Sequence, residues 1–349
     1  MEAFLPARTD AGRPDRLLAA GIFREEARRQ GFVRVGIARA AAPPRFERFR
    51  DWIAAGRHAD MAYLARTAGV RAEPERLLPG ARSVVCLAFK HAASPPVAAD
   101  GSVVARYALG ADYHGHLRWR ALALAREAER RIGRFAWRVC VDSTPLAERS
   151  FAAAAGLGWI GKNGCLIDPE HGSWLLLAEI LTDLDLPADE PIAEQCGSCT
   201  RCLTACPTGA FLEPGLLDAG RCIAYWTIEH RGPIPDAIKE QLGPQVFGCD
   251  ICQEVCPYNA PLPVDQPSAD LPTRREWLEI GRGAWRRRFG ATALNRAGRR
   301  GLQRNAACSA GAVRDASCLP VLSGAAGLRD RAVSDAARWA STRLTAGPR

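Results

Sequence analysis

The stretch Cys196-Gly-Ser-Cys199-Thr-Arg-Cys202-Leu-Thr-Ala-Cys206-Pro207 decides how the middle of this chain folds. Its cysteines are separated by two, two and three residues, and a proline follows the last one. This is the bacterial ferredoxin spacing, in which cysteine thiolates hold [4Fe–4S] clusters. The spacing therefore predicts a ferredoxin-like module at this point in the chain.

A second cysteine run follows the first and completes a set of eight thiols. It reads Cys249-x2-Cys252-x3-Cys256-Pro257, and a single further cysteine, Cys222, lies between the runs. Eight thiolates suit two four-iron clusters, and in two-cluster ferredoxins the fourth cysteine of each run ligates the other cluster. We therefore expect one cluster on Cys196, Cys199, Cys202 and Cys256, and the other on Cys206, Cys222, Cys249 and Cys252. Cys222 is the displaced member, because it lies far upstream of Cys249.

Other uses of these cysteines fit the spacing less well. Zinc sites favour paired Cys-x2-Cys knuckles with a longer gap between them. Disulfide frameworks are typical of small secreted domains, whereas this chain has 349 residues and shows no secretion signal. A radical-SAM site needs Cys-x3-Cys-x2-Cys, and Asn259 stands where the third cysteine would be.

Composition indicates a protein of two or three domains outside the membrane. No run of 18 apolar residues is present, and the start of the chain has no apolar signal core. Arg28-Arg29 is followed by a polar residue and not by an apolar run, so a twin-arginine export signal is not indicated. We expect a cytoplasmic monomer.

The net charge of +9 is concentrated near the C-terminus. Residues 271–304 contain ten arginines and two glutamates, a net charge of +8. Such a region could bind a polyanion. The alternative is a solvated helical face rich in arginine.

Residue patterns predict an α+β protein with three parts. Amphipathic spacing predicts helices over 17–30, 46–55 and 116–132, and short apolar runs predict strands over 83–89, 137–141 and 173–181. We expect a mixed α/β domain over residues 1–190 and the two-cluster module over 191–262. A helical, HEAT-like basic segment over 263–349 follows a linker rich in proline, and residues 298–301 would separate two of its helices.

Three features of the N-terminal part are candidates for chemistry. The segment 156–164 is dense in glycine and contains Lys162, which suits either close approach to a large ligand or a tight turn. Asp142 follows a predicted strand and could donate a proton, or could cap the next helix. His114 lies in a broken version of a cobalamin-binding motif, since Leu117 replaces its final glycine, and a structural role is the commoner explanation.

Together these segments resemble the epoxyqueuosine reductase family, cobalamin-dependent iron–sulfur enzymes of queuosine biosynthesis. The resemblance covers most of the chain. It rests on the residues around Asp112-Tyr-His, on Val141-Asp-Ser, on 155–163, on the first cysteine run, and on the segments 222–232 and 247–259. In this family pattern a cysteine precedes Thr-Ile-Glu-His-Arg-Gly, which accounts for the position of Cys222.

The resemblance implies an activity, cofactors and site residues. It implies that the N-terminal domain binds cobalamin base-off, without a histidine on cobalt, and that two clusters relay electrons to it from an external donor. The substrate would be epoxyqueuosine at the wobble position of tRNA, reduced to queuosine, with Asp142 as proton donor. Candidates near the corrin are Lys162, Asn163, Asp250 and Gln253. Arg231 is a candidate for tRNA contact by the same resemblance, and Arg286, Arg299 and Arg304 are candidates because they lie in the basic region 271–304.

Two rival functions fit the sequence less well. A corrinoid reductive dehalogenase would also pair cobalamin with two clusters, but such enzymes usually carry a twin-arginine signal and lack an arginine-rich helical tail. A ferredoxin-type carrier would leave the N-terminal domain without a role.

Overall fold

The computed structural model describes residues 15–91, 97–259 and 271–346. The chain divides into two units that do not follow chain order. The first unit contains residues 1–91, 114–200 and 257–262, and the second contains 92–113, 201–256 and 263–349. The predicted proline-rich linker lies largely in 260–270, outside the described residues. None of the described helices is long and apolar enough to cross a membrane.

The first unit is built on a four-stranded sheet with strand order β1-β2-β7-β4. These strands span Arg34–Arg39, Ser83–Lys90, Leu175–Thr182 and Trp137–Cys140, respectively. Every neighbouring pair is antiparallel. The predicted strands are thereby confirmed within two residues, and the fold is α+β. In α/β folds, ligands bind beyond the ends of parallel strands. The strands of this sheet are antiparallel, so that rule does not explain why Asp142 follows the end of β4.

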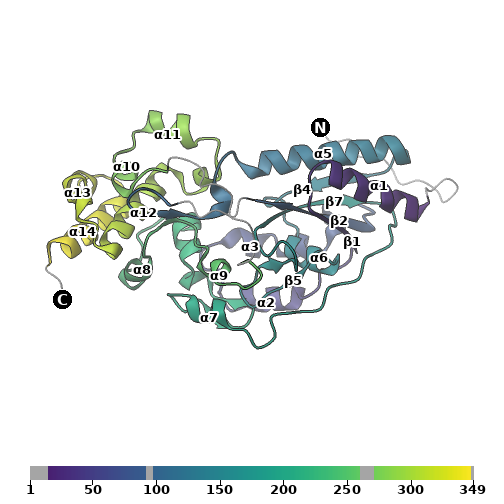
Figure 1. Cartoon of the computed structure of the whole chain (residues 1–349), viewed down its shortest axis with the longest axis horizontal. Coiled ribbons are helices and arrows are strands. Elements are labelled where there is room, and N and C mark those ends of the chain that lie inside the picture. Colours follow the sequence, from purple (N-terminus) through teal and green to yellow (C-terminus); the bar gives the residue numbers. More distant parts are fainter. Residues whose placement is uncertain (1–14, 92–96, 260–270, 347–349) are drawn as a thin grey trace. The chain divides into compact units, whose positions relative to one another are not determined.

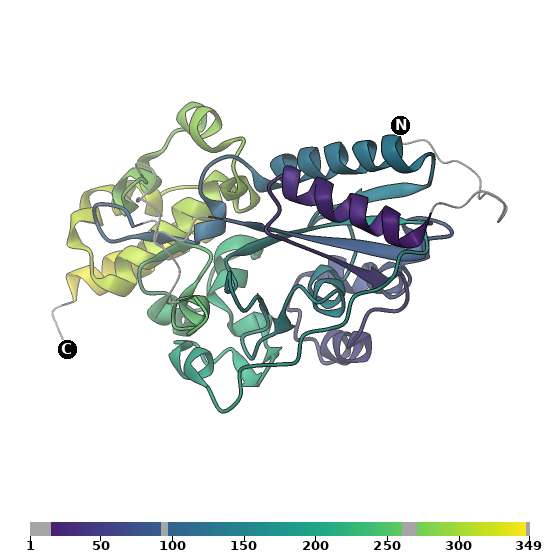
Figure 2. The same ribbon diagram turned by 45° about the vertical axis from the view of Figure 1, so that its right-hand side comes forward.

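Helices cover both faces of this sheet (Figures 1 and 2). On one face α1 (Arg16–Arg29) and α5 (Tyr113–Ile132) run side by side, and Arg131 of α5 donates to Glu26 of α1 at 2.6 Å. On the other face lies α6 (Glu148–Ala154), which contacts β1, β2 and β7. The short helices α2 (Phe46–Ala54), α3 (Ala62–Arg66) and α4 (Ala68–Ala72) also belong to this unit. The predicted helices over 17–30, 46–55 and 116–132 are confirmed.

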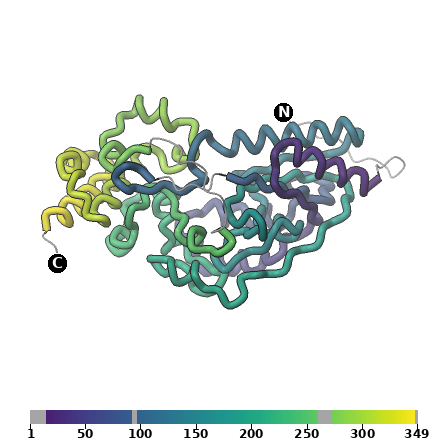
Figure 3. Tube along the Cα trace, viewed as in Figure 1, coloured from purple at the N-terminus to yellow at the C-terminus, as the bar shows by residue number. Residues whose placement is uncertain are grey.

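The second unit combines a short parallel strand pair with helices from two parts of the chain. Strand β3 (Val103–Val104) pairs with β10 (Gln245–Phe247), so that residues before α5 lie among much later ones (Figure 3). The cysteine module adds α7 (Arg201–Ala205), the hairpin of β8 (Phe211–Glu213) and β9 (Leu216–Leu217), the π-helix η4 (Tyr225–Glu229), α8 (Asp236–Gln241) and α9 (Ile251–Glu254). The C-terminal helices are α10 (Arg274–Glu279), α11 (Arg282–Phe289), α12 (Gly298–Val313), α13 (Leu319–Ala326) and α14 (Arg331–Thr345).

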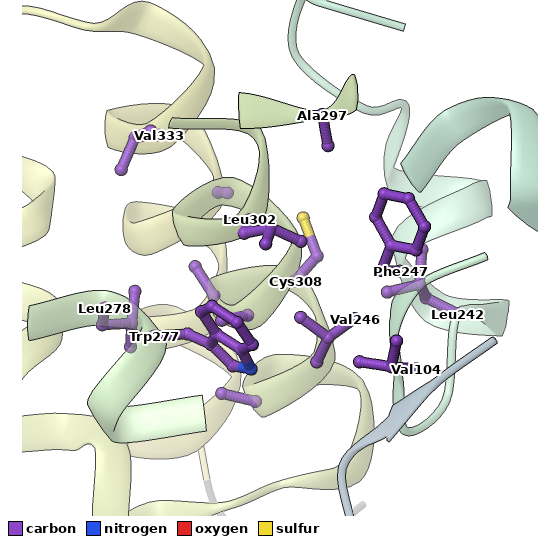
Figure 4. Close-up of a cluster of buried hydrophobic side chains, with 14 of the residues drawn as sticks. Val104, Leu242, Val246, Phe247, Trp277, Leu278, Ala297, Leu302, Cys308 and Val333 are labelled. Atoms are coloured by element: carbon purple, nitrogen blue, oxygen red, sulfur yellow. The ribbon is translucent and has the colours of Figure 1, made fainter. Parts of the chain in front are cut away.

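One apolar core joins these helices to the cysteine module. Helix α12 is its centre, since ten of its sixteen residues are buried. Figure 4 shows Val104, Val246 and Trp277, from β3, β10 and α10, around the α12 side chains Leu302 and Cys308. The prediction that residues 298–301 separate two helices is wrong, because these residues form the first turn of α12. The two glycines suggested a break between helices, but Gly298 is the first residue of α12.

Candidate active site and cluster module

Asp142 lies on a loop just beyond the end of β4, in a backbone conformation that aspartate adopts more readily than most residues. Its φ is +43°, in the left-handed region, where Asn and Asp are enriched. Its backbone N–H donates to Oε1 of Glu148, the first residue of α6. Asp142 does not cap α6, whose N-cap is Ala147. Capping of α6 therefore does not account for the carboxyl group of Asp142, whose side chain is 55% exposed.

His114, near the start of α5, contacts the carboxyl group of Asp142. Its Nε2 lies 2.8 Å from Oδ2 of Asp142. The sequence favoured a structural role for this histidine. His114 and Asp142 are 28 positions apart, and no motif in the sequence links them. The pair makes His114 part of the same site, where it can orient the Asp142 carboxyl group or share a proton with it.

Two further carboxyl groups lie behind Asp142, those of Glu148, which follows Val141-Asp-Ser in the family pattern, and Glu179; the sequence assigned neither of them a role. Burial, followed by the charge of Asp142, raises the pKa of Glu148 to about 8. Burial, followed by the charges of Glu148 and Asp142, raises the pKa of Glu179 well above its ordinary range. Glu179 carried a detectable signal, because it is the single charged residue in the apolar strand Leu175–Thr182.

The segment 156–164 forms a tight hairpin with the residues that follow it. Strands β5 (Trp159–Ile160) and β6 (Leu166–Ile167) pair there, and a Cβ on Gly158 would lie 2.2 Å from the carbonyl oxygen of Ile167. This glycine is thus required by the backbone of the protein itself. The finding supports the tight-turn interpretation for this part of the segment.

Residues of this hairpin hold the first cysteine run. Nζ of Lys162 donates to the carbonyl oxygens of Gly197 and Cys199, the latter at 3.0 Å. Nε1 of Trp159 donates to Sγ of Cys196 at 3.5 Å. Asn163 is buried, and its Oδ1 accepts the N–H of Cys165 at 3.1 Å. Lys162 and Asn163 therefore have structural contacts next to the module.

In the second unit, three of the thiols expected on the second cluster lie close enough to influence one another's charge. Burial raises the pKa of Cys249 to about 12, and the charges of Cys222 and Cys206 act in the same direction. Backbone N–H groups point at these sulfurs: Ala224 and Tyr225 donate to Cys222, Ile251 to Cys249, and Ala210 to Cys206. N–H donors of this kind stabilise thiolates and tune cluster potentials.

The thirteen cysteines are all free thiols. No three His, Cys, Asp or Glu side chains converge on a single metal ion within the described ranges. A four-iron cluster binds its thiolates at separate irons, so its ligands stand further apart than those of one ion. The free thiols with their N–H donors fit such a cluster.

Helix α12 holds the backbone that carries Cys222 and Cys249. Asn305 donates through Nδ2 to the carbonyl oxygens of Thr227 and Val246, both at 2.8 Å. Arg304 donates to the carbonyl oxygens of Trp226, His230 and Gly232 at 2.6–2.9 Å. Both residues are at most 1% exposed. The prediction that Arg304 contacts tRNA is therefore wrong, because its guanidinium group is buried in the protein.

Asp250 and Gln253 belong to a second polar cluster of this unit. Oδ2 of Asp250 accepts the backbone N–H of Arg106 at 2.7 Å, and Gln253 donates to Oδ1 of Asp250 at 3.3 Å. Burial raises the pKa of Asp250 to about 6. These contacts join the segment before α5 to the second cysteine run.

An arginine-lined pocket of about 570 Å³ lies among the C-terminal helices. Its lining includes Arg282, Arg286, Arg299 and Arg300, together with Trp285 and Asn295, and no carboxylate of a described residue lines it. Burial, then the charges of Arg300 and Arg282, lowers the pKa of Arg299. The structure thus brings together two predicted tRNA contacts, Arg286 and Arg299. Arg231 lies outside the pocket lining and donates to the carbonyl oxygens of Ala297 and Arg296.

Comparison with known proteins settles the family. Residues 195–259 match the model of the 4Fe-4S double cluster binding domain, and residues 71–143 match "Epoxyqueuosine reductase QueG, DUF1730". An epoxyqueuosine reductase of Gloeobacter violaceus is 42% identical over 313 residues, which is 85% of this chain and 97% of that protein. The chain belongs to the epoxyqueuosine reductase family. It is therefore an oxidoreductase that reduces epoxyqueuosine.

Solved structures of epoxyqueuosine reductases share the fold. A crystal structure with an epoxyqueuosine-modified tRNA-Tyr stem loop superimposes with a TM-score of 0.84 at 30% identity, covering 92% of this chain and 89% of that one. A Bacillus subtilis structure, with its catalytic aspartate loop swung out of the active site, gives 0.84 at 29% identity and the same coverage. The predicted family and the presence of a double-cluster domain are confirmed.

Proposed function

We propose that this epoxyqueuosine reductase converts epoxyqueuosine to queuosine at the wobble position of tRNA, with cobalamin and two [4Fe–4S] clusters as cofactors. The observation that carries the proposal is the match over 97% of a curated relative of the same activity. The tRNA stem loop bound by a solved relative supports tRNA as the substrate.

The functional domains are part of this proposal. Residues 1–190 would bind cobalamin, 191–262 would hold the clusters, and 263–349 would form a basic HEAT-like segment. Cobalamin supplies low-valent cobalt as the reductant when it is bound. The base-off form of cobalamin, without a protein histidine on cobalt, is part of the same proposal. Lys162, Asn163, Asp250 and Gln253 stay the candidates near the corrin, and each already has polar contacts inside its own unit.

In the proposed mechanism, residues of this chain donate a proton and form the site that receives the modified tRNA base. Asp142 donates a proton to the epoxide oxygen as it departs, and His114 fixes the orientation of the carboxyl group through Nε2. An unpaired anticodon base can leave its stack at modest cost to reach such a site. In the Bacillus subtilis relative the catalytic aspartate loop is swung out of the active site, and we propose that the Asp142 loop can also swing out.

The eight cysteines would divide between the clusters as their spacing predicts. Cys196, Cys199, Cys202 and Cys256 would hold the first cluster, and Cys206, Cys222, Cys249 and Cys252 the second. The electrons come from an external donor. We also propose that the protein works as a cytoplasmic monomer with no membrane partner.

Dependence on cobalamin tests the cofactor assignment. Anaerobically prepared protein with intact clusters should bind added cobalamin and shift its visible spectrum to the base-off form. A spectrum unchanged from that of free cobalamin would contradict the assignment.

The arginine-lined pocket is the candidate binding site for tRNA phosphate groups. Replacing Arg286 and Arg299 together by glutamine should raise the Kd for the modified stem loop by about ten-fold at low salt, because two phosphate contacts are lost. The slope of log K against log salt should fall by about two, since each contact contributes about one. Fluorescence anisotropy over a salt series measures both quantities.

Arg275→Gln is the matched control, because Arg275 lies on α10 outside the pocket lining and pairs with Glu279. It should leave the Kd within two-fold, as a rough allowance for its long-range charge. An unchanged Kd and salt slope in the double variant would show that this pocket is a solvated arginine face.

A further inference from the structure

The loop of Asp142 contacts the carboxyl group of Glu148. Asp142 has a positive φ and its N–H donates to Oε1 of Glu148, so this contact holds the loop in a conformation that most side chains disfavour. Glu148 as a residue is only partly buried, but protein surrounds its carboxyl group. Glu148 can therefore act on the reaction through Asp142.

Glu179 lies deeper in the same unit, under α6. It stands opposite Cys86 of β2 and Cys140 of β4, and α6 contacts its strand. Glu179 is 0% exposed, and neither carboxyl oxygen has a hydrogen-bond partner among the described residues. An ionised carboxylate in such a place is very costly, so this group holds a proton at neutral pH.

The chemistry of the reaction requires two protons where Asp142 carries one. When an epoxide becomes an alkene, both C–O bonds break, a C=C bond forms and the oxygen leaves as water. The reaction consumes two electrons, which the external donor would supply, and two protons, which are added to the oxygen. After the first transfer Asp142 is a carboxylate and has to be protonated again.

We propose that Glu148 is a positioning residue for this reaction, which holds the Asp142 loop in place and keeps the proton that restores Asp142 between the two transfers. The Glu148 acid gives its proton to the Asp142 carboxylate and becomes a carboxylate itself, and water returns the proton after product release. A proton source inside the protein matters when the substrate base covers Asp142, because Asp142 then cannot take a proton from bulk water. This inference rests on the proposed role of Asp142.

Charged and titratable neighbours face these groups from several elements. Arg149 on α6 and Arg71 on α4 act on Glu148 with charges that favour its ionised form, and Asp142 acts against it. His114 on α5 contacts Asp142, and the thiols of Cys86 and Cys140 lie beside Glu179. The two arginines do not overcome burial, since the pKa of Glu148 stays raised to about 8.

Replacing Glu148 by glutamine separates positioning from proton storage. The amide oxygen of Glu148→Gln still accepts the Asp142 N–H but cannot supply a proton. The single-turnover rate of wild-type protein should fall above about pH 8, where Glu148 ionises. Glu148→Gln should be about ten-fold slower or worse below that pH, with unchanged tRNA affinity and no such alkaline fall. Glu47→Gln, an exposed change on α2, is the control with wild-type behaviour.

Infrared spectroscopy tests the same point without turnover. Wild-type protein with its clusters, but without tRNA, should lose a protonated-carboxyl band between about pH 7 and pH 9.5, and Glu148→Gln should not. A wild-type protein without that titrating band, or a Glu148→Gln variant with the wild-type rate and alkaline fall, would overturn the inference. If wild type fails to turn over while the band is present, the proposed function has failed and the carboxyl assignment has not.

Discussion

Asp142→Asn should lower the turnover rate by about 10²- to 10⁴-fold, the usual contribution of a general acid. Asparagine is the informative replacement, because it adopts a positive φ readily and can keep both the Glu148 contact and a partner for His114. The loop should therefore stay in place while the proton donor is lost. Single-turnover conversion, followed by nucleoside mass spectrometry, measures the effect.

Cluster content, cobalamin binding and tRNA affinity should be unchanged in this variant. Asp51→Asn is the matched control, since it makes the same change at an exposed aspartate on α2. Turnover at the wild-type rate in Asp142→Asn would remove Asp142 from the mechanism.

Cys222→Ala should remove the second cluster and stop turnover altogether. Iron should fall from about eight to about four atoms per chain, because the first cluster keeps its four predicted ligands. The thiol of Cys222 is buried beside Cys206 and Cys249, and water has little access there to replace it. Iron analysis with electron paramagnetic resonance of the reduced protein distinguishes the two clusters.

Cys165→Ala is the control for the loss of a cysteine, because Cys165 lies outside both runs and is only partly buried. It should keep about eight iron atoms per chain. Full iron content in Cys222→Ala would show that another residue is the fourth ligand of the second cluster.

Local patterns predicted the cysteine module and three of the four strands of the main sheet, but not the fourth strand, β1 (Arg34–Arg39). The strand Ser83–Lys90 is apolar over most of its length and fully buried over its first six residues, so its pattern alone identifies it. The family model over 195–259 agrees with the cysteine spacing, which depends only on local chain geometry. Strand direction was not accessible in the same way, because it depends on how distant segments pair.

Contacts between distant residues account for what the sequence could not show. His114 and Asp142 meet through the packing of α5 and the end of β4, and no pattern along the chain records that contact. Arg304 was misassigned because a count of charges does not distinguish a buried arginine from an exposed one. Arg286 and Arg299 were chosen on the same count, and they do line one pocket.

Conversion of the substrate nucleoside tests the central claim most directly. Protein with verified clusters, cobalamin and a reductant is incubated without oxygen with tRNA that carries epoxyqueuosine, and the nucleosides are analysed by mass spectrometry. We predict that the epoxyqueuosine signal is replaced by queuosine, and that omission of cobalamin prevents this. An unchanged epoxyqueuosine signal with both cofactors present would contradict the account.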